Sequence, residues 1–322
     1  MYSICYVLAD DEKRFYINQL LISIKSLRKH MPDIKVSILV DEDTKNICDH
    51  SEAFVQLEHT EVIAVKTPSG LSKKEIGYYL KTVTYEYMNN DYLFIDTDTL
   101  IYRKFPDTIS DCSIALVYDF NIKRRIDYEN LVKQNKKYGY DVTNYDTYYN
   151  TGVMWVKKDR IAKRIFSEWN KEWLKNQAKG LIFDQQAFNY IINNNPEGIG
   201  TLQNIWNCQI AAIPSPVLEL HDALILHYFN VMKSPFMLSH EEYKYASSDS
   251  ELVRDIIEDP KKGFLPFSIE TYGRNQESFQ RTALYRGFFW LYNKHKKIYN
   301  VFDRILYPVV LLGRRYTRKT EK

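Results

Sequence analysis

The chain has 322 residues, of which 45% are hydrophobic and 26% are charged, a balance that is typical of a folded soluble protein and excludes a largely disordered one. No apolar run reaches the ~18–20 residues that cross a bilayer, and the amino end shows no secretory signal. The formal net charge of +3 is unevenly spread, because residues 281–322 carry +9 and the preceding 280 residues carry −6.

Strand-like and helix-like segments alternate along most of the chain. In chain order we predict a strand at residues 4–9, a helix at 14–30, strands at 36–40 and 62–65, a helix at 73–88, strands at 92–95, 113–117 and 152–156, helices at 160–174 and 184–192, a strand at 223–226 and a helix at 250–258. This order predicts an α/β fold with a mostly parallel sheet and helices on both faces. Ligands of such sheets bind beyond the carboxyl ends of the strands.

The four cysteines are scattered, at positions 5, 48, 112 and 208, and none belongs to a C-x-x-C pair. We therefore expect reduced, buried thiols in a reducing compartment rather than disulfides or zinc ligands.

Acidic residues follow several of the predicted strands. Asp96 and Asp98 follow the strand at 92–95, and residues two apart on an extended backbone point to the same side. Two carboxylates presented together suit Mg²⁺ or Mn²⁺, and such ions often bind phosphate oxygens as well. Asp41-Glu42-Asp43 is a second match to this pattern, which we interpret as a solvated loop and helix cap.

A histidine and a lysine stand close together far downstream. His227 follows the apolar strand at 223–226, and Lys233 lies in a loop that ends at Pro235. A lone histidine in such a place is more often structural than a ligand. A neutral imidazole could nevertheless complete a metal sphere, and an ammonium group could pair with a diphosphate.

Two further polar segments complete the candidate site. Asn150-Thr151-Gly152 places an amide, a hydroxyl and a backbone without a side chain at the mouth of a strand, where glycine permits close approach of a ligand. Asp184 and Gln185 stand at the start of a predicted helix, where an aspartate also serves as an ordinary cap.

These motifs, in this order, resemble the family 8 glycosyltransferases of GT-A fold, which include glycogenin and bacterial galactosyl- and glucosyltransferases of lipopolysaccharide assembly. The resemblance covers residues 3–235. It implies a GT-A catalytic domain over residues 1–240, with a Rossmann-like mixed sheet, and leaves 241–322 as a helical C-terminal region.

The resemblance also implies roles for individual residues. Asp96, Asp98 and His227 match the metal ligands, and the cofactor is then Mn²⁺ or Mg²⁺. Asp184 and Gln185 match the pair beside the anomeric carbon. The remaining matches are implied to bind the nucleotide sugar: Leu8, Ala9, Asp10, Tyr16, Lys81, Thr97, Asn150, Thr151, Gly152, Asn230 and Lys233.

Three positions depart from the family pattern. Asn230 replaces the usual glycine, Ser234 separates Lys233 from Pro235, and Tyr79 stands near a common arginine. These departures leave the predicted metal site intact and leave the donor sugar open.

The resemblance implies transfer of a hexose, glucose or galactose, from a UDP-sugar to a hydroxyl of a glycan or lipid-linked acceptor, with retention at the anomeric carbon. Double displacement would need a carboxylate nucleophile, whereas Gln185 is a poor one, so we favour attack on the same face as the leaving group. Asp184 would bind sugar hydroxyls.

The tyrosines at 138, 140, 145, 148 and 149 either stack on sugars or pack as a flap on the body.

The basic, aromatic tail at 281–322 shows apolar residues at helical spacing between 298 and 312, flanked by lysines and arginines. This pattern predicts an element that binds an anionic membrane surface, on the cytoplasmic face of the cell membrane. The alternative is a helix that packs on the body or on a second copy of the chain, as a homodimer. Nucleic acid is not an expected partner, because the acidic body opposes it.

Two other functions remain open. A sugar-nucleotide nucleotidyltransferase also uses carboxylates and Mg²⁺, but it would need a Gly- and Arg-rich loop after the first strand, where this chain has Ala9-Asp10-Asp11-Glu12. A membrane-docked glycan-binding protein without catalysis would bind a sugar without releasing UDP.

Overall fold

The computed structural model describes residues 2–10, 15–119, 125–140, 147–209 and 223–227, together with isolated residues between 254 and 308. The chain divides into two compact units, residues 1–272 and 273–322. The domain boundary expected after residue 240 stays a prediction. Most of the helix predicted at 250–258 lies outside the described residues.

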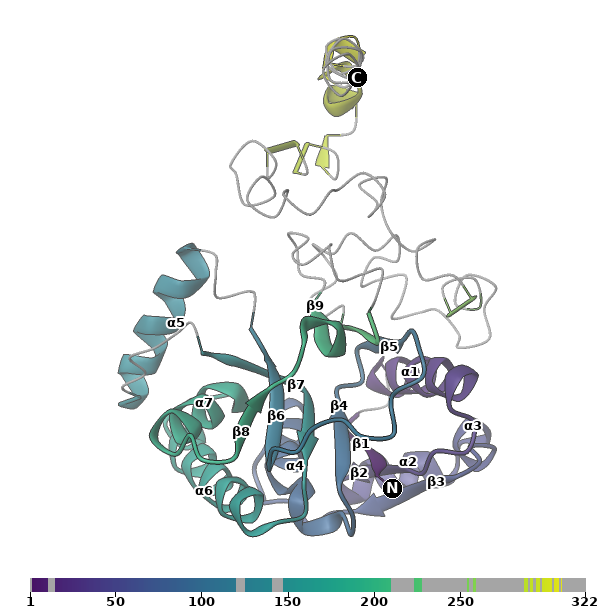
Figure 1. The fold of residues 1–322 in the computed structure, drawn as a ribbon, viewed down its shortest axis with the longest axis vertical. Helices are drawn as coiled ribbons and strands as arrows, with labels where there is room; N and C mark the ends of the chain where they lie inside the picture. Colours follow the sequence, from purple (N-terminus) through teal and green to yellow (C-terminus); the bar gives the residue numbers. More distant parts are fainter. Residues whose placement is uncertain are drawn as a thin grey trace. The chain divides into compact units, whose positions relative to one another are not determined.

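A seven-stranded sheet forms the centre of the first unit, in the order β3-β2-β1-β4-β7-β6-β8 (Figure 1). Its strands are β1 (Ser3–Leu8), β2 (Val36–Val40), β3 (Thr60–Ala64), β4 (Tyr92–Ile95), β6 (Ile114–Tyr118), β7 (Tyr149–Val156) and β8 (Ile199–Thr201). Six of them run in one direction, and β7 runs against both of its neighbours, β4 and β6. The predicted α/β fold with a mostly parallel sheet is thereby confirmed.

Helices cover both faces of this sheet, which is why most of its strands are nearly continuous apolar runs. One face packs against α1 (Phe15–His30), α2 (Glu42–Asp49) and α3 (Glu52–Val55). The other packs against α4 (Lys73–Tyr87), α6 (Arg160–Gln177) and α7 (Asp184–Asn194). Figure 1 shows α1 on one side of the strands and α6 with α7 on the other.

Local sequence signals set where two of these helices begin. A capping box starts α4, in which the Ser72 and Glu75 side chains satisfy each other's backbone N–H groups. The Asp159 side chain accepts a hydrogen bond from the Ala162 N–H at the start of α6. These caps fix where each helix begins relative to the sheet.

A second, three-stranded sheet consists of β5 (Thr99–Ile101), β10 (Ile225–His227) and β9 (Cys208–Gln209), in that order. A short 3-10 helix, η2 (Asn204–Asn207), leads into β9. The antiparallel pairing of β10 with β5 sets His227 opposite Thr99, one residue beyond Asp98. This small sheet brings a distant part of the chain to the end of β4.

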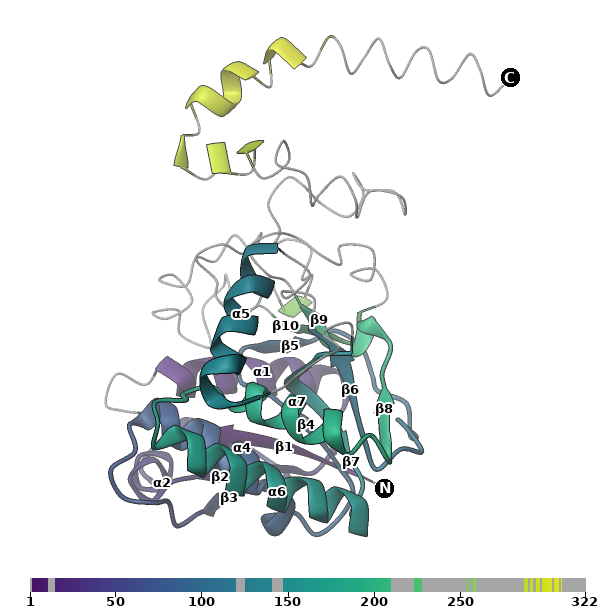
Figure 2. The same ribbon diagram turned by 90° about the vertical axis from the view of Figure 1, so that its left-hand side faces the viewer.

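Helix α5 (Arg125–Tyr138) was not predicted, because its sequence is mostly polar and charged. Figure 2 shows α5 next to α7, and the Gln186 amide of α7 donates to Asn135 of α5.

The tyrosines near α5 were predicted either to stack on sugars or to pack on the body. Tyr140, Tyr148 and Tyr149 are buried, and the Tyr140 ring stacks on that of Tyr190 at 4.8 Å. All three therefore pack on the body, Tyr148 also lines a cavity of about 310 Å³, and Tyr145 lies outside the described residues.

All four cysteines are free thiols. Cys5, Cys48 and Cys208 are buried, as predicted, whereas Cys112 is half-buried rather than buried. In the part of the chain that the structure describes, no helix is both long and apolar enough to span a bilayer.

Candidate active site and metal centre

Two adjacent cavities lie at the edge of the large sheet where six of its strands end and β7 begins. One, of about 180 Å³, is lined by the end of β1, by Tyr16 and Gln19 of α1, by α4 and by Thr97. The other, of about 310 Å³, is lined by the first residues of β7 and α7 and by His227. Four residues line both cavities: Tyr78, Lys81, Asp96 and Asp98.

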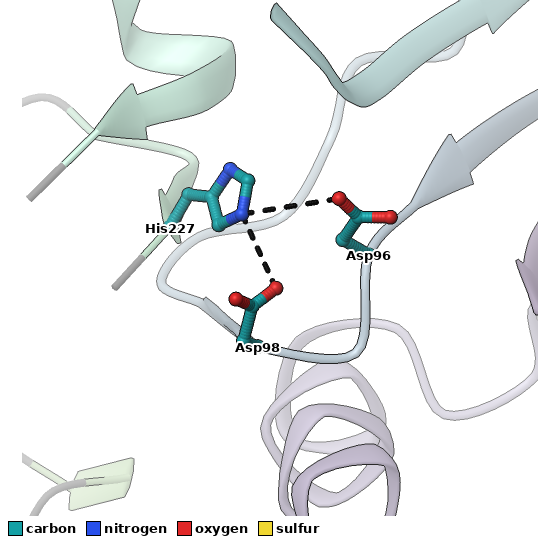
Figure 3. A group of neighbouring side chains, drawn as sticks. All are labelled: Asp96, Asp98 and His227. Atoms are coloured by element: carbon teal, nitrogen blue, oxygen red, sulfur yellow. Dashed lines mark ion pairs between the residues drawn. The ribbon is translucent and has the colours of Figure 1, made fainter. Parts of the chain in front are cut away.

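Asp96, Asp98 and His227 form a compact cluster where the two cavities meet. Each offers one ligand atom, and these atoms lie within 4.8 Å of one another. The imidazole Nε2 of His227 lies 3.2 Å from Asp98 Oδ1 and 4.0 Å from Asp96 Oδ2, and Figure 3 shows it turned toward both carboxylates. Two hard oxygen ligands and one imidazole suit Mn²⁺ or Mg²⁺, so the residues present fit a divalent ion.

Gly152 makes room for this cluster. The backbone carbonyl of Gly152 accepts a hydrogen bond from the Asp96 N–H at 2.7 Å. A Cβ atom on Gly152 would lie 2.2 Å from His227 Cε1 and 2.8 Å from Asp96 Oδ2. Only a residue without a side chain allows the backbone of β7 to approach the cluster this closely.

Burial and charge set the protonation of the two aspartates in opposite directions. Burial raises the pKa of the Asp96 carboxyl to about 6, although the Lys81 ammonium beside it pulls that pKa down. Burial also acts on Asp98, but the neighbouring His227 imidazole outweighs it and holds the pKa of Asp98 below its usual value. Asp98 thus loses its proton at a lower pH than Asp96 does.

A pH dependence of stability follows from the raised pKa of Asp96. The folded chain holds the Asp96 proton more tightly than the unfolded chain does, so this carboxyl stabilises the fold at low pH and loses that contribution as the pH rises through about 6. In chelator, we expect the wild type to lose on the order of 2 kcal/mol relative to Asp96→Asn between about pH 4 and pH 6. Chemical denaturation of both proteins measures the difference, and a constant difference would contradict the assignment.

Lys81 of α4 is a buried cation at the junction of the cavities. Its Nζ lies 2.9 Å from Asp96 Oδ1 and 3.7 Å from Asp184 Oδ2, and it is only 5% exposed. Burial alone would lower the pKa of Lys81, but Asp184 and Asp96 outweigh burial and raise it. The ammonium therefore stays charged and balances the carboxylates around it.

Asp184 and Gln185 stand at the start of α7 and are held there by the neighbouring elements. The Trp169 indole N–H of α6 donates to the Asp184 backbone carbonyl at 3.0 Å. Asn189, one turn later, exchanges two hydrogen bonds with the backbone of Tyr149 and so fastens α7 to the first residue of β7. The Asp184 carboxylate accepts a hydrogen bond from the Thr151 hydroxyl at 3.1 Å.

Both ends of the Gln185 amide have a partner. Its Nε2 donates to Asp119 Oδ2 at 2.7 Å, and its Oε1 accepts from the Thr151 N–H at 3.2 Å. The pairing of β6 with β7 shifts between Leu116 and Val117, so Thr151 has no partner on β6 and its N–H can reach Gln185. A carboxylate only accepts and a backbone N–H only donates, so these two contacts agree on the orientation of the amide.

We expect Asp119→Asn to lower turnover about tenfold, since a neutral acceptor holds the Gln185 amide less firmly than a carboxylate does. The metal affinity should not change, because Asp119 follows β6 and holds Gln185, which is not one of the three clustered residues. Steady-state kinetics and calorimetry on one preparation measure both quantities. Unchanged turnover, or a parallel loss of metal affinity, would contradict this role.

Most of the residues predicted to bind the nucleotide sugar line one of the cavities. Leu8, Ala9, Tyr16 and Thr97 line the smaller one, Asn150, Thr151 and Gly152 line the larger one, and Lys81 lines both. Asn230 and Lys233 lie outside the described residues.

Asp10 and Asp41 make contacts within the fold, and the predicted role of Asp10 in binding the nucleotide sugar stays a prediction. Asp10, 2% exposed, accepts a hydrogen bond from the Ile17 N–H at 2.6 Å and so caps the first turn of α1. Asp41 takes the N-cap position of α2, as predicted, but it is buried and paired with Lys73 rather than solvated.

Sequence reasoning missed two residues of the site. Asp119 follows β6 just as Asp96 follows β4, and that shared position was the signal that could have revealed it. Asn207 lies at the end of η2 and contacts His227, and nothing in the sequence around it indicates this role.

No family model matches the chain, and no curated protein matches it by sequence. Several solved structures are similar to the chain. The galactosyltransferase LgtC, in complex with donor and acceptor sugar analogs, is similar with a TM-score of 0.51 at 16% identity, over 80% of this chain and 95% of that one. An active-site mutant of LgtC gives 0.50 at 15% identity, over 75% and 93%. Mouse xyloside xylosyltransferase 1 gives 0.47 at 14% identity, over 71% and 98%.

The chain therefore has the GT-A fold of solved glycosyltransferases, as the sequence predicted. The Asp96, Asp98 and His227 cluster lies at the carboxyl edge of its sheet, where ligands of such folds bind.

Proposed function

We propose that this protein is a retaining, metal-dependent hexosyltransferase that moves glucose or galactose from a UDP-sugar to a hydroxyl of a glycan or lipid-linked oligosaccharide. The observation that carries the proposal is the cluster of Asp96, Asp98 and His227 at the junction of two cavities. One cavity would hold the nucleotide and the other the sugar, with the diphosphate between them.

Asp96, Asp98 and His227 would hold the divalent ion, which, when bound, offsets the negative charge of the leaving diphosphate. Lys81 keeps Asp96 and Asp184 in place through its two ion pairs. The Asp184 carboxylate is oriented by the Thr151 hydroxyl and would accept a hydrogen bond from a sugar hydroxyl. Gly152 lets the backbone of β7 approach the residues that would hold the ion.

Same-face attack accounts for retention with these residues. The bond from the anomeric carbon to the phosphate oxygen breaks while the bond to the acceptor oxygen forms on the same face. The proton of the acceptor hydroxyl passes to an oxygen of the departing diphosphate. The dipole of the Gln185 amide, fixed by Asp119 and Thr151, would stabilise the positive charge that develops on the sugar.

The test is a panel of UDP-sugars with Mn²⁺, in which slow release of UDP is followed without an acceptor. We expect one or two hexose donors to be hydrolysed, and we expect chelator to stop the release. Pyrophosphate formation from a sugar phosphate and UTP would instead indicate a nucleotidyltransferase. Sugar binding without release of any product would indicate a glycan-binding protein.

Membrane attachment at the cytoplasmic face is a further part of the proposal. Among the described residues of the second unit, Trp290, Val301 and Ile305 are more than half exposed on helical segments that also carry Lys294, Lys297 and Arg304. Exposed apolar and basic side chains on one helical segment favour binding to anionic lipid. Sedimentation with phosphatidylglycerol vesicles at low salt, but not with phosphatidylcholine vesicles, is the expected result.

A further inference from the structure

A chain of buried amides connects His227 to the backbone of β7. The Gly152 N–H donates to Asn150 Oδ1 at 2.9 Å, and Asn207 Nδ2 donates to the same oxygen at 2.9 Å. Asn207 Oδ1 lies 3.0 Å from His227 Nδ1. Asn207 is 0% exposed and His227 is 3% exposed, so water does not replace these contacts.

The orientation of each group follows from the first donor. A backbone N–H can only donate, so the Asn150 atom that faces Gly152 must be the oxygen. The Asn207 atom that faces this oxygen must then be the NH₂ group, because two amide oxygens would repel each other. The carbonyl oxygen of Asn207 is left facing His227, and an oxygen there requires the proton of the ring to be on Nδ1.

We propose that Asn207 is a positioning residue that keeps the imidazole proton of His227 on Nδ1, so that Nε2 offers its lone pair to a divalent cation. This inference rests on the metal site of the proposed function. The opposite tautomer would carry a proton on Nε2, the atom 3.2 Å from Asp98, and could not bind an ion there.

The same chain of contacts joins the metal ligand to the sugar side of the site. Asn207 ends η2, His227 belongs to β10, and Asn150 belongs to β7 and lines the larger cavity. Asn207 thus ties three elements together at the point where the small sheet meets the large one. Its amide sets the direction of the imidazole as well as its tautomer.

Two substitutions of Asn207 with side chains of similar size test whether Asn207 acts by accepting a hydrogen bond from His227 or only by filling space. Asn207→Asp can still accept from His227 Nδ1, whereas Asn207→Leu cannot. We expect Asn207→Leu to weaken Mg²⁺ and Mn²⁺ binding about 10–100-fold. Asn207→Asp loses the hydrogen bond donated to Asn150 but keeps the acceptor that faces His227, so we expect it to bind both ions more tightly than Asn207→Leu does. Asn176→Leu is the matched control, because Asn176 is equally buried and contacts Tyr140 and Glu172 instead of the metal site.

Two measurements read the result without any transfer reaction. Calorimetry gives the affinity for each ion, and ¹⁵N spectra of the Mg²⁺-loaded protein report which ring nitrogen of His227 carries the proton. We expect the proton on Nδ1 in the wild type and in Asn207→Asp, and a changed ring signal in Asn207→Leu. The Asn176→Leu control should match the wild type in both measurements.

Three outcomes would overturn the inference: wild-type affinity in Asn207→Leu, an equal loss in Asn207→Asp, or a wild-type ring that carries its proton on Nε2. A wild-type protein that binds no divalent ion would instead contradict the metal site of the proposed function. The two failures are therefore distinguishable.

Discussion

Replacing Asp96 by asparagine is expected to lower metal-dependent release of UDP by about a thousandfold. The substitution keeps the size of the side chain but removes the charge that faces His227 and Lys81. A neutral amide is a poor ligand for a hard divalent ion, so both the metal affinity and the turnover should fall. Coupled measurement of UDP release across a Mn²⁺ titration separates the two effects.

Asp49→Asn is the control for this experiment, because Asp49 is an exposed carboxylate that pairs with Lys45 at the end of α2. We expect wild-type turnover and metal affinity in this variant. Full activity of Asp96→Asn, with its dependence on metal unchanged, would refute the assignment of Asp96 as a ligand.

Adding one methyl group at Gly152 is expected to disrupt the metal site. The new Cβ would lie 2.8 Å from both Asp96 Oδ2 and His227 Nδ1 and closer still to His227 Cε1. The imidazole cannot move aside easily, because it is buried and held by Asn207 and by the pairing of β10 with β5. We expect Gly152→Ala to weaken Mn²⁺ binding about a hundredfold, as measured by calorimetry.

A second glycine provides the matched control. In Gly200→Ala the Cβ would lie 2.4 Å from Cys112 Sγ, a comparable clash in β8. We expect it to destabilise the fold by about 1–3 kcal/mol without changing the metal affinity. If both variants lost affinity equally, general destabilisation rather than crowding of the site would be the cause.

The sequence predicted the large sheet well, because its strands are apolar runs buried on both faces and the helices between them have a clear apolar side. The sequence did not predict the reversed direction of β7, because an apolar strand shows the same residue pattern in either direction. The strands β5 and β9 span three residues and two residues, too few for a periodic pattern.

Some residues of the candidate site could be predicted from the sequence and others could not. Asp96 and Asp98 could be singled out because two carboxylates follow a buried strand, and the structure sets His227 beside them. Asp119 occupies the same kind of position after β6 and escaped notice because a single aspartate is common. Asn207 could not have been predicted, because its role depends on three elements meeting in space.

Because His227 belongs to the small sheet, an ion at the candidate site would connect two distant parts of the chain. Asp96 and His227 are separated by roughly 130 residues, so an ion bound between them would close a loop of that length. In a chain whose cysteines form no disulfide, such an ion would act as a removable crosslink between the large sheet and the small one. Its arrival would tighten the segment that carries His227, and its departure would release that segment.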